Sequence, residues 1–419
     1  MRKQPSALIL YHYLYPDDVV SSVHLTELAT GLVERGWQVT ASSGNRGCRD
    51  ESQTYPLRCE WMGVQFRRMW RPRFRQSSSL GRIANAIWMI TAWSLLALDP
   101  RVRPDVLIMG TDPILSPLVA LFWRVCRPNV RIVHWCFDLF PEAAIVDGLL
   151  REGSASVRLV KWLLKRAYAC CDLIVDIGGC MHALLQQYGS KAAVETIPPW
   201  ALAEPAGTAQ VDEDERTNLF GDASLGLLYS GNFGRAHTWQ GIPELAEALA
   251  PLGGRVAFSV RGNGVDALKT AFEQIPVHFA GFASSDRLEA RLGSADVHIV
   301  SLREDWTGTV VPSKFFGALA MGRPVLFIGS EESAVARWIR ELGVGWVLVP
   351  ETMSEVMGEL LTVARSPRTK ETLFRHCQQM YRTHFSRSLA LDRWDTELRR
   401  LVEIPGERAV PAQAAAGQR

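Results

Sequence analysis

The chain has 419 residues, more than a single hydrophobic core usually holds, so two domains are expected. Its 46 Lys and Arg nearly balance its 44 Asp and Glu, which leaves a net charge of +2. Because duplex binding normally shows as a clustered basic excess, this balance argues against a nucleic-acid partner.

The first residues, MRKQPSALILYHY, combine a basic start with a short apolar run and lack a small-residue cleavage site. This pattern predicts a first β-strand rather than a signal peptide, and a cytoplasmic location is expected. The eight Cys form no paired C-x-x-C ladder, so we expect reduced thiols. Cys170, Cys171, Cys180 and His182 form only a loose cluster. Adjacent Cys seldom both ligate one tetrahedral ion, and no metal site is predicted.

Short β-branched runs alternate with amphipathic segments through the first half of the chain. HLTELATGLVERG (24–36), for example, has apolar residues at helical spacing and a closing Gly36. Strands are predicted at residues 7–13, 37–42, 64–69, 105–110, 131–135, 172–177 and 194–198. This alternation predicts a doubly wound parallel sheet in an N-terminal domain, residues 1–200.

Two neighbouring stretches raise the question of membrane contact. IANAIWMITAWSLLALDP (83–100) is apolar but shorter than the ~20 residues of a membrane span, and it carries Asn85. We therefore expect a buried or interfacial helix there. FRRMWRPRFRQ (66–76) interleaves five Arg with aromatic residues, as either a solvated loop or a surface resting on anionic headgroups. Peripheral contact with the inner membrane stays open.

The alternation breaks in a stretch rich in Pro, Ala and charge, and residues 201–222 are predicted to be a linker. A second series of strands follows at 225–230, 255–260, 277–281, 296–302, 324–329 and 345–350. It predicts a second Rossmann-like domain, residues 223–387, then a helix at 388–403 and a disordered tail at 404–419. The predicted fold class is α/β, with two doubly wound Rossmann-like domains facing a central cleft. Ligands of such sheets bind beyond the carboxyl ends of the strands.

Two cations follow strands of the second domain. In LLYSGNFGR, Gly231 and Gly234 allow a tight turn in which backbone N–H groups can approach an anion, and Arg235 follows. In VVPSKFFGALAMG, Pro312 suits a first helical turn, which also holds Lys314. A cation at a helix N-terminus is unfavourable unless an anion is shared with the free N–H groups. We therefore predict a diphosphate site.

The order of SGNFGR (230–235), VHFAG (277–281) and VPSKFFGALAMGRPV (311–325), after a first α/β domain, resembles family-4 (group 1) glycosyltransferases of the GT-B fold. The similarity is greatest to bacterial enzymes that build lipid-linked cell-surface polysaccharides. It implies a nucleotide-sugar donor in the second domain and an acceptor in the first. It also implies a retaining, metal-independent transfer without a cofactor, and a terminal helix that crosses back to the first domain.

The resemblance also assigns donor-side residues. Arg235 and Lys314 would hold the diphosphate as catalytic groups. The family often has two Glu separated by seven intervening residues, but Thr309 and Gly317 stand at those positions, and Glu304 or Asp305 would replace one of them. Donor contacts are expected from Gly231, Asn232, Gly234, Gly262, Gly264, Gly281, Phe282, Glu304, Thr309, Pro312 and Ser313. Phe282 is equally compatible with a place in the core.

On the acceptor side, VHWCFDLFPEAAIVDGL (133–149) follows a strand and resembles a segment of the polysaccharide-assembling members. Asp138 is predicted to contact the acceptor hydroxyl, as a base or an orienting group. Glu142, Ser21, Ser22 and Thr111 are further acceptor-side candidates. His134, inside a strand, is expected to be structural.

Two other classes remain possible. A dinucleotide oxidoreductase shares the sheet type, but the first strand leads into YPDDVVSS, without G-x-G-x-x-G. A non-catalytic scaffold of a polysaccharide assembly complex would explain the missing Glu pair, although it would not need to keep both Arg235 and Lys314.

Overall fold

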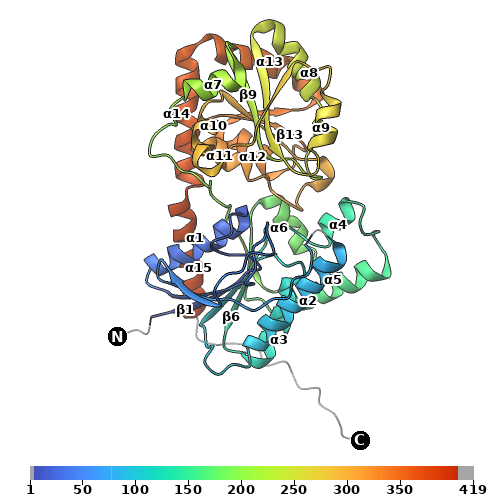
Figure 1. Ribbon diagram of the computed structural model, residues 1–419, viewed down its shortest axis with the longest axis vertical. Coiled ribbons are helices and arrows are strands. Elements are labelled where there is room, and N and C mark those ends of the chain that lie inside the picture. The colour runs from blue at the N-terminus through green and yellow to red at the C-terminus, as the bar shows by residue number, and fades with distance from the viewer. Residues whose placement is uncertain (1–3, 77, 404–419) are drawn as a thin grey trace, which may run out of the picture.

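The computed structural model describes residues 4–76 and 78–403, which form two α/β domains stacked along the longest axis of the molecule (Figure 1). The N-terminal domain contains an eight-stranded sheet and the C-terminal domain a six-stranded sheet. All neighbouring strands are parallel except β3 and β4. The predicted class, two doubly wound Rossmann-like domains, is confirmed.

The N-terminal sheet has the strand order β3-β4-β2-β1-β5-β6-β7-β8. Its central strands are continuous apolar runs because helices cover both faces, as in VLIM of β5, which is buried throughout. The strands are β1 (Ser6–Leu10), β2 (Gln38–Ser42), β3 (Arg58–Trp61), β4 (Val64–Arg67), β5 (Val106–Met109), β6 (Arg131–Trp135), β7 (Leu173–Asp176) and β8 (Ala193–Thr196). The helices are α1 (Val20–Glu34), α2 (Ser79–Leu96), α3 (Val119–Cys126), α4 (Glu142–Val146), α5 (Ala155–Tyr168) and α6 (Gly179–Gln186).

The C-terminal sheet has the order β11-β10-β9-β12-β13-β14, so the strand order reverses beside β9 and β12. Its strands are β9 (Leu225–Asn232), β10 (Gly254–Arg261), β11 (Val277–Ala280), β12 (Val297–Ser301), β13 (Val325–Ile328) and β14 (Gly345–Leu348). Its helices are α8 (Ile242–Leu249), α9 (Val265–Ala271), α10 (Leu288–Gly293), α11 (Lys314–Ala320), α12 (Ala334–Leu342), α13 (Met353–Arg365) and α14 (Pro367–His384). A reversal of this kind marks the usual ligand site of an open parallel sheet.

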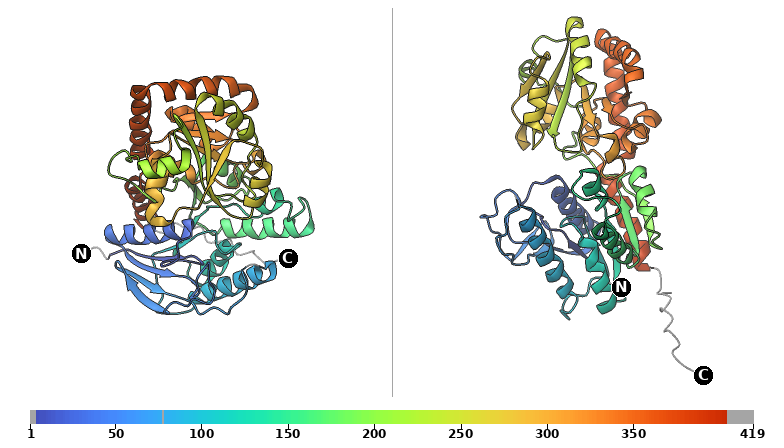
Figure 2. Two further views of the ribbon diagram at one scale, coloured as in Figure 1. Left: turned by 45° about the horizontal axis from the view of Figure 1, so that its top comes forward. Right: turned by 90° about the vertical axis from the view of Figure 1, so that its right-hand side faces the viewer.

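The last helix, α15 (Arg387–Glu403), leaves the C-terminal domain and runs down the side of the N-terminal one (Figures 1 and 2). It lies against α1, where Gly31 leaves room for Leu391: a Cβ on Gly31 would come within 2.6 Å of it. Trp37 Nε1 donates to Asp395 Oδ1 at 2.6 Å, and Trp394 packs 4.9 Å from Trp135. These contacts attach α15, which continues from the C-terminal domain, to the N-terminal domain, and so hold the two domains together.

Two local predictions need correction, and a third is not tested. The second half of the expected linker forms helix α7 (Glu213–Phe220), in which the Asp212 side chain caps the Glu215 N–H at 3.0 Å. The acid-rich first turn, favoured at a helix N-terminus, made this segment resemble a solvated loop. Strand β3 was missed because RCEW alternates exposed and half-buried positions and has no β-branched residue. The tail predicted at 404–419 lies outside the described residues.

The carboxyl ends of the strands in both domains face the junction between the domains. There Asp138, beyond β6, forms an antiparallel bridge with Val310 of the C-terminal domain. The Leu139 N–H donates to the Thr309 carbonyl oxygen at 2.8 Å. The loop after β6 is thus joined directly to the segment that leads into α11, and the two predicted ligand sites become neighbours.

Candidate active site

Lys314 is a largely desolvated cation at the end of β9. Its Nζ donates to the Asn232 carbonyl oxygen at 2.8 Å and lies 5.3 Å from the centre of the Tyr229 ring. Among the residues that the structure describes, no Asp or Glu pairs with it. Burial lowers the pKa of Lys314 to about 7. A desolvated ammonium without a counter-ion costs free energy, which an anion bound beside it would recover.

His237 holds this lysine in place. Its Nδ1 lies 2.8 Å from the Ser301 carbonyl oxygen, and its Nε2 lies 3.0 Å from Lys314 Nζ. Because a carbonyl oxygen only accepts, Nδ1 carries the proton and Nε2 accepts from the ammonium. Burial, with a smaller effect of the Lys314 charge, lowers the pKa of His237 to about 3. The imidazole is therefore neutral at working pH, and it orients Lys314 without adding charge.

Gly231 makes this arrangement possible. Its φ of 120° is rarely adopted by other residues, and a Cβ at this position would lie 3.0 Å from Lys314 Cε. Gly262 and Gly264 serve the neighbouring loop instead, where added Cβ atoms would lie 2.6 Å from Asn232 Oδ1 and 2.9 Å from the Phe233 ring. Gly234 lies in the turn that follows β9. These glycines let the backbone pack closely at the ends of β9 and β10.

Helix α11 begins at Lys314 itself, with Ser313 as N-cap residue and Pro312 before it, and the Ser313 side chain makes no capping bond. The prediction that Lys314 lies in the first helical turn is confirmed, whereas Pro312 lies outside the helix rather than in that turn. The cation is as close to the positive end of the helix as the backbone allows.

Arg235 is not directed at the same point as Lys314 in this structure. Its Nη1 lies 2.7 Å from Asp147 Oδ2, so it pairs with the residue that ends α4 in the other domain. The Arg235 side chain is 54% exposed, whereas that of Asp147 is 11% exposed. Arg235 and Lys314 therefore converge, as expected, only if the Arg235 guanidinium leaves Asp147. An exposed side chain can do this by rotating about its own bonds.

Gly281 and Phe282 lie beyond the end of β11. An added Cβ on Gly281 would meet nothing within 4 Å, and Phe282 is 43% exposed, so this residue is not part of the core. The Arg261 guanidinium stacks over the Phe282 ring at 4.2 Å. An exposed aromatic ring beside open backbone can accommodate a planar base.

A pocket of about 330 Å³ lies beyond the ends of β1, β5 and β6 in the N-terminal domain. Its polar lining includes Tyr11, Ser21, Thr111, Asp112, His134 and Asp138. Asp138 is exposed towards the open pocket, and desolvation by the surrounding protein, together with the charge of Asp112, raises its pKa to about 6. Asp138 is bridged to Val310, only four residues before Lys314. The loop that carries Asp138 thus lies beside the segment that leads into Lys314.

The other acceptor-side candidates divide into two groups. Ser21 and Thr111 line the pocket. Ser22 does not, because it is fully buried in the first turn of α1. Glu142 is also absent from the pocket lining: its Oε1 accepts from Tyr188 at 2.8 Å and lies 3.3 Å from Lys161 Nζ. Burial gives Ser22 a structural position, and these two contacts give Glu142 one.

His134 was expected to be structural, and its Nδ1 does bond the Met109 carbonyl oxygen at 3.1 Å. It also lines the pocket, and its buried Nε2 has no protein partner among the described residues. The Cys170–His182 cluster does not converge, since His182 Nδ1 lies 3.0 Å from Asp176 and the Cys171 thiol bonds the Ala167 carbonyl oxygen at 3.6 Å.

Comparisons with known proteins agree with this arrangement. A family model described as a glycosyl transferase 4-like domain matches residues 21–200. A probable glycosyltransferase of Pseudomonas aeruginosa, WbjE, is 28% identical over 296 residues, which is 67% of this chain and 71% of WbjE. The chain is a glycosyltransferase of the GT-B fold, with a glycosyl transferase 4-like domain at residues 21–200.

Solved structures with this GT-B architecture match nearly the whole chain. Sucrose-phosphate synthase from Thermosynechococcus elongatus superposes with a TM-score of 0.70 at 16% identity, covering 95% of this chain and 99% of that one. WaaG, a glycosyltransferase involved in lipopolysaccharide biosynthesis, gives 0.63 at 16% identity, covering 93% and 99%. HepE of Anabaena in complex with UDP gives 0.63 at 14% identity, covering 94% and 99%. At these identities the likeness shows the fold.

The two positions where this glycosyltransferase lacks the expected Glu pair are structural. Thr309 is buried and its Oγ1 donates to the Trp306 carbonyl oxygen at 2.8 Å, while Gly317 faces Leu292 from inside α11. Glu304 is exposed in a short 3₁₀ turn, and Asp305 pairs with Arg303 at 2.6 Å. Of these four residues, Glu304 alone has an exposed carboxylate that forms no ion pair within the described part of the chain.

Sequence reasoning missed His237, Asp112 and Asp147. His237 lies two residues beyond Arg235 in the same loop, which is the one signal that pointed to it. Asp112 lies in the sequence GTDP (110–113), directly after β5. Only the folded pocket shows that its charge acts on Asp138. Asp147 has no local signal at all, because its partner is 88 residues away.

Proposed function

We propose that this glycosyltransferase moves a sugar from a nucleoside-diphosphate sugar to a lipid-linked glycan or another cell-surface glycoconjugate acceptor. The observation that carries the proposal is Lys314, a desolvated ammonium with no acidic partner among the described residues, at the strand ends where such a fold binds its ligand. HepE, a protein of the same fold, has been solved with UDP, and WaaG is involved in lipopolysaccharide biosynthesis. Both support a nucleotide-sugar donor and a polysaccharide-assembly role.

On the donor side, Lys314 and Arg235 stabilise the diphosphate as it leaves. When the bond between the anomeric carbon and the phosphate oxygen breaks, negative charge grows on that oxygen. A cation already held in place stabilises this charge more in the transition state than in the ground state. Gly231, Asn232, Gly234 and the Ser313–Lys314 turn supply backbone groups, and Gly281 with Phe282 borders the base.

On the acceptor side, Asp138 accepts the proton of the attacking hydroxyl. Its pKa of about 6 makes it ionised at neutral pH yet basic enough to take a proton as the new C–O bond forms. Ser21, Thr111 and Asp112 line the same pocket and orient the acceptor.

The transfer is proposed to be retaining and metal-independent. The acceptor hydroxyl arrives on the sugar face from which the diphosphate leaves, and the protein's own cations neutralise the leaving group. A lipid-linked acceptor places the enzyme at a membrane, and we assign it to the cytoplasmic face of the inner membrane.

A panel of UDP-, GDP- and TDP-sugars tests the proposal. The purified chain should show a higher melting temperature with one nucleotide class. It should also release the nucleoside diphosphate when a membrane lipid extract is added, with EDTA present and with the anomeric configuration retained in the product. Stabilisation by NAD(H) alone, or donor binding without any transfer or hydrolysis, would contradict it. Donor binding without any transfer or hydrolysis is the result expected of a non-catalytic scaffold.

A further inference from the structure

Helix α2 has two apolar faces. One packs into the core through Met89, Trp93 and Leu96, which are buried. The other faces outward: Leu80, Ile83, Ile87 and Leu95 are 81%, 47%, 62% and 54% exposed, and they recur at helical spacing. An apolar stripe of this length on a surface helix is costly in water, and it indicates that something covers it.

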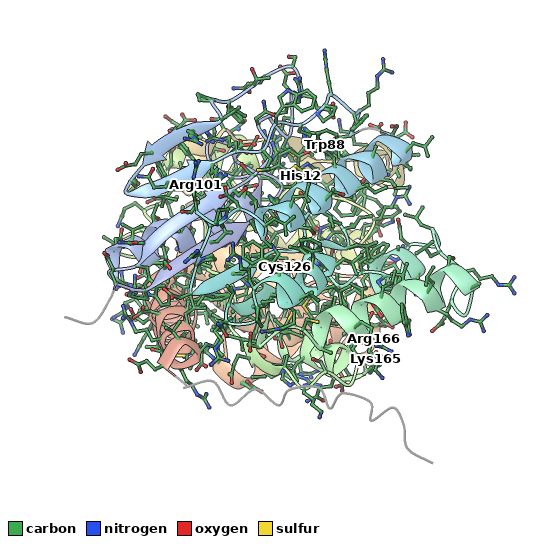
Figure 3. The ribbon with its side chains drawn as sticks, turned by 90° about the horizontal axis from the view of Figure 1, so that it is seen from below. His12, Trp88, Arg101, Cys126, Lys165 and Arg166 are labelled. Atoms are coloured by element: carbon green, nitrogen blue, oxygen red, sulfur yellow. The ribbon has the colours of Figure 1, made fainter. Side chains whose placement is uncertain are left out.

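The neighbouring helices continue this stripe. Helices α2, α3 and α5 pack side by side, and Figure 3 shows them crossing one face of the N-terminal domain, with Trp88, Cys126, Lys165 and Arg166 labelled on them. Val125 of α3 is 81% exposed, and Trp162 of α5 is 52% exposed. Together with the adjoining segments, this face carries twelve of the twenty large hydrophobic side chains that are exposed in the described chain: Trp70, Leu80, Ile83, Ile87, Trp88, Leu95, Leu98, Ile114, Phe122, Val125, Leu159 and Trp162. We call it the α2–α3–α5 face.

The helices of this face carry cations and no acids, while Asp99, in the adjoining segment that carries Leu98, pairs with Arg67 at 2.8 Å. The three helices, of 18, 8 and 14 residues, contain no Asp or Glu, although the whole chain has 44. Lys165 and Arg166 are exposed at one end of the face, where the Arg166 guanidinium lies 5.1 Å from the Trp162 ring centre. At the other end, beside Arg101 in Figure 3, a pocket of about 400 Å³ is lined by four arginines: Arg58, Arg67, Arg101 and Arg103.

We propose that the α2–α3–α5 face docks this chain on an anionic lipid bilayer. Apolar side chains flanked by Arg, Lys and Trp are the pattern of a segment that lies in the membrane interface, with its cations on the headgroups. Trp70 and Trp88 belong to that interface: Trp88 Nε1 donates to the Trp70 carbonyl oxygen at 2.8 Å, which fixes the exposed rings together. No helix among residues 4–76 and 78–403 is long and apolar enough to cross a bilayer, so this docking is parallel to the surface.

The face adjoins the pocket that holds Asp138. Ile114 is 41% exposed and also lines that pocket, and the short turn after it packs against α2, α3 and α5. Leu164 of α5 lines the pocket from behind. Docked on this face, the chain keeps the edge of the pocket at Ile114 close to the lipid surface. This last step rests on the proposed function, because it assumes that the pocket takes a lipid-linked acceptor.

Flotation with 100-nm vesicles tests the docking without any sugar donor. The full chain should float with phosphatidylcholine vesicles containing 30% phosphatidylglycerol, and weakly or not at all with phosphatidylcholine alone. Ile87→Glu/Leu95→Glu should weaken binding by more than tenfold. Lys165→Ala/Arg166→Ala should weaken it about thirtyfold, since each interfacial cation contributes about a fivefold gain.

Matched controls lie on the C-terminal domain. Leu252→Glu changes an equally exposed apolar residue, and Arg365→Ala/Arg368→Ala removes two exposed cations; neither should alter flotation. All variants should keep the wild-type melting temperature and its shift with a nucleotide sugar, which separates loss of docking from loss of fold or of donor binding. Absence of wild-type flotation, equal effects of the control variants, or a face that instead mediates dimerisation by light scattering would overturn the proposal.

Discussion

The two domains share one architecture, yet their strand ends present opposite charges to the junction between them. The C-terminal domain presents Lys314 and Arg235, whereas the N-terminal domain presents Asp112 and Asp138. Desolvation favours the neutral form of one group on each side: it lowers the pKa of Lys314 and raises that of Asp138. In the proposed function, the cation that stabilises the leaving diphosphate and the carboxylate that accepts the proton of the attacking hydroxyl thus lie in different domains.

The outer surfaces differ as well. Between residues 223 and 387, Leu252 and Phe282 are the large hydrophobic side chains that are exposed among the described residues, whereas the N-terminal domain exposes an apolar face. In the proposed function, the C-terminal domain binds a soluble, charged donor and the N-terminal domain an amphipathic acceptor. The following variants test this division of roles between the domains, in order of decreasing expected effect.

Asp138→Asn should lower turnover by about 10²–10⁴-fold, the usual contribution of a positioned general base. The wild type should also lose activity as the pH falls through about 6, because Asp138 is ionised only above its pKa. The variant should lose this acid limb while its donor affinity stays unchanged. An exposed acid on α9, Asp266→Asn, is the control. A retained acid limb in Asp138→Asn would show that another group is the base.

Lys314→Met should lower turnover by about 10²–10³-fold, as removal of one preorganised charge donor does elsewhere. The same change should raise the melting temperature, by about 2–4 °C for each kcal/mol gained, because a desolvated unpaired ammonium is removed. Lys269→Met, an exposed lysine of α9, should do neither. A variant that is less stable than the wild type would show that Lys314 is a structural residue.

Asp147→Asn releases Arg235 from its partner in the other domain. Because the guanidinium side of this pair is exposed, the pair is worth about 0–1 kcal/mol, and donor affinity should rise by at most about fivefold. Titration of the donor into both proteins measures this. Weaker binding would instead mean that Asp147 holds Arg235 in its working position.

Much of the fold followed from the sequence, because buried parallel strands are continuous apolar runs. Each predicted strand overlaps an observed one, whereas the half-exposed β3 was missed. At the site, Lys314 stood out because a cation opposes the charge of a helix N-terminus. His237 and Asp147 did not stand out, because their roles depend on partners 77 and 88 residues away. A local sequence pattern reveals a charge in an unfavourable position. It does not reveal the tertiary contacts that orient that charge.

The central claim is that Lys314 is a cation kept without an acidic partner for a diphosphate. Calorimetry of donor binding in buffers of different ionisation enthalpy tests it directly, since a nucleotide sugar does not titrate between pH 6 and 8. If the pKa of Lys314 rises from about 7 on binding, the complex should take up ~0.1 proton at pH 6 and ~0.9 proton at pH 8, and Lys314→Met should take up none. Donor binding by the wild type without proton uptake at pH 8 would contradict the claim.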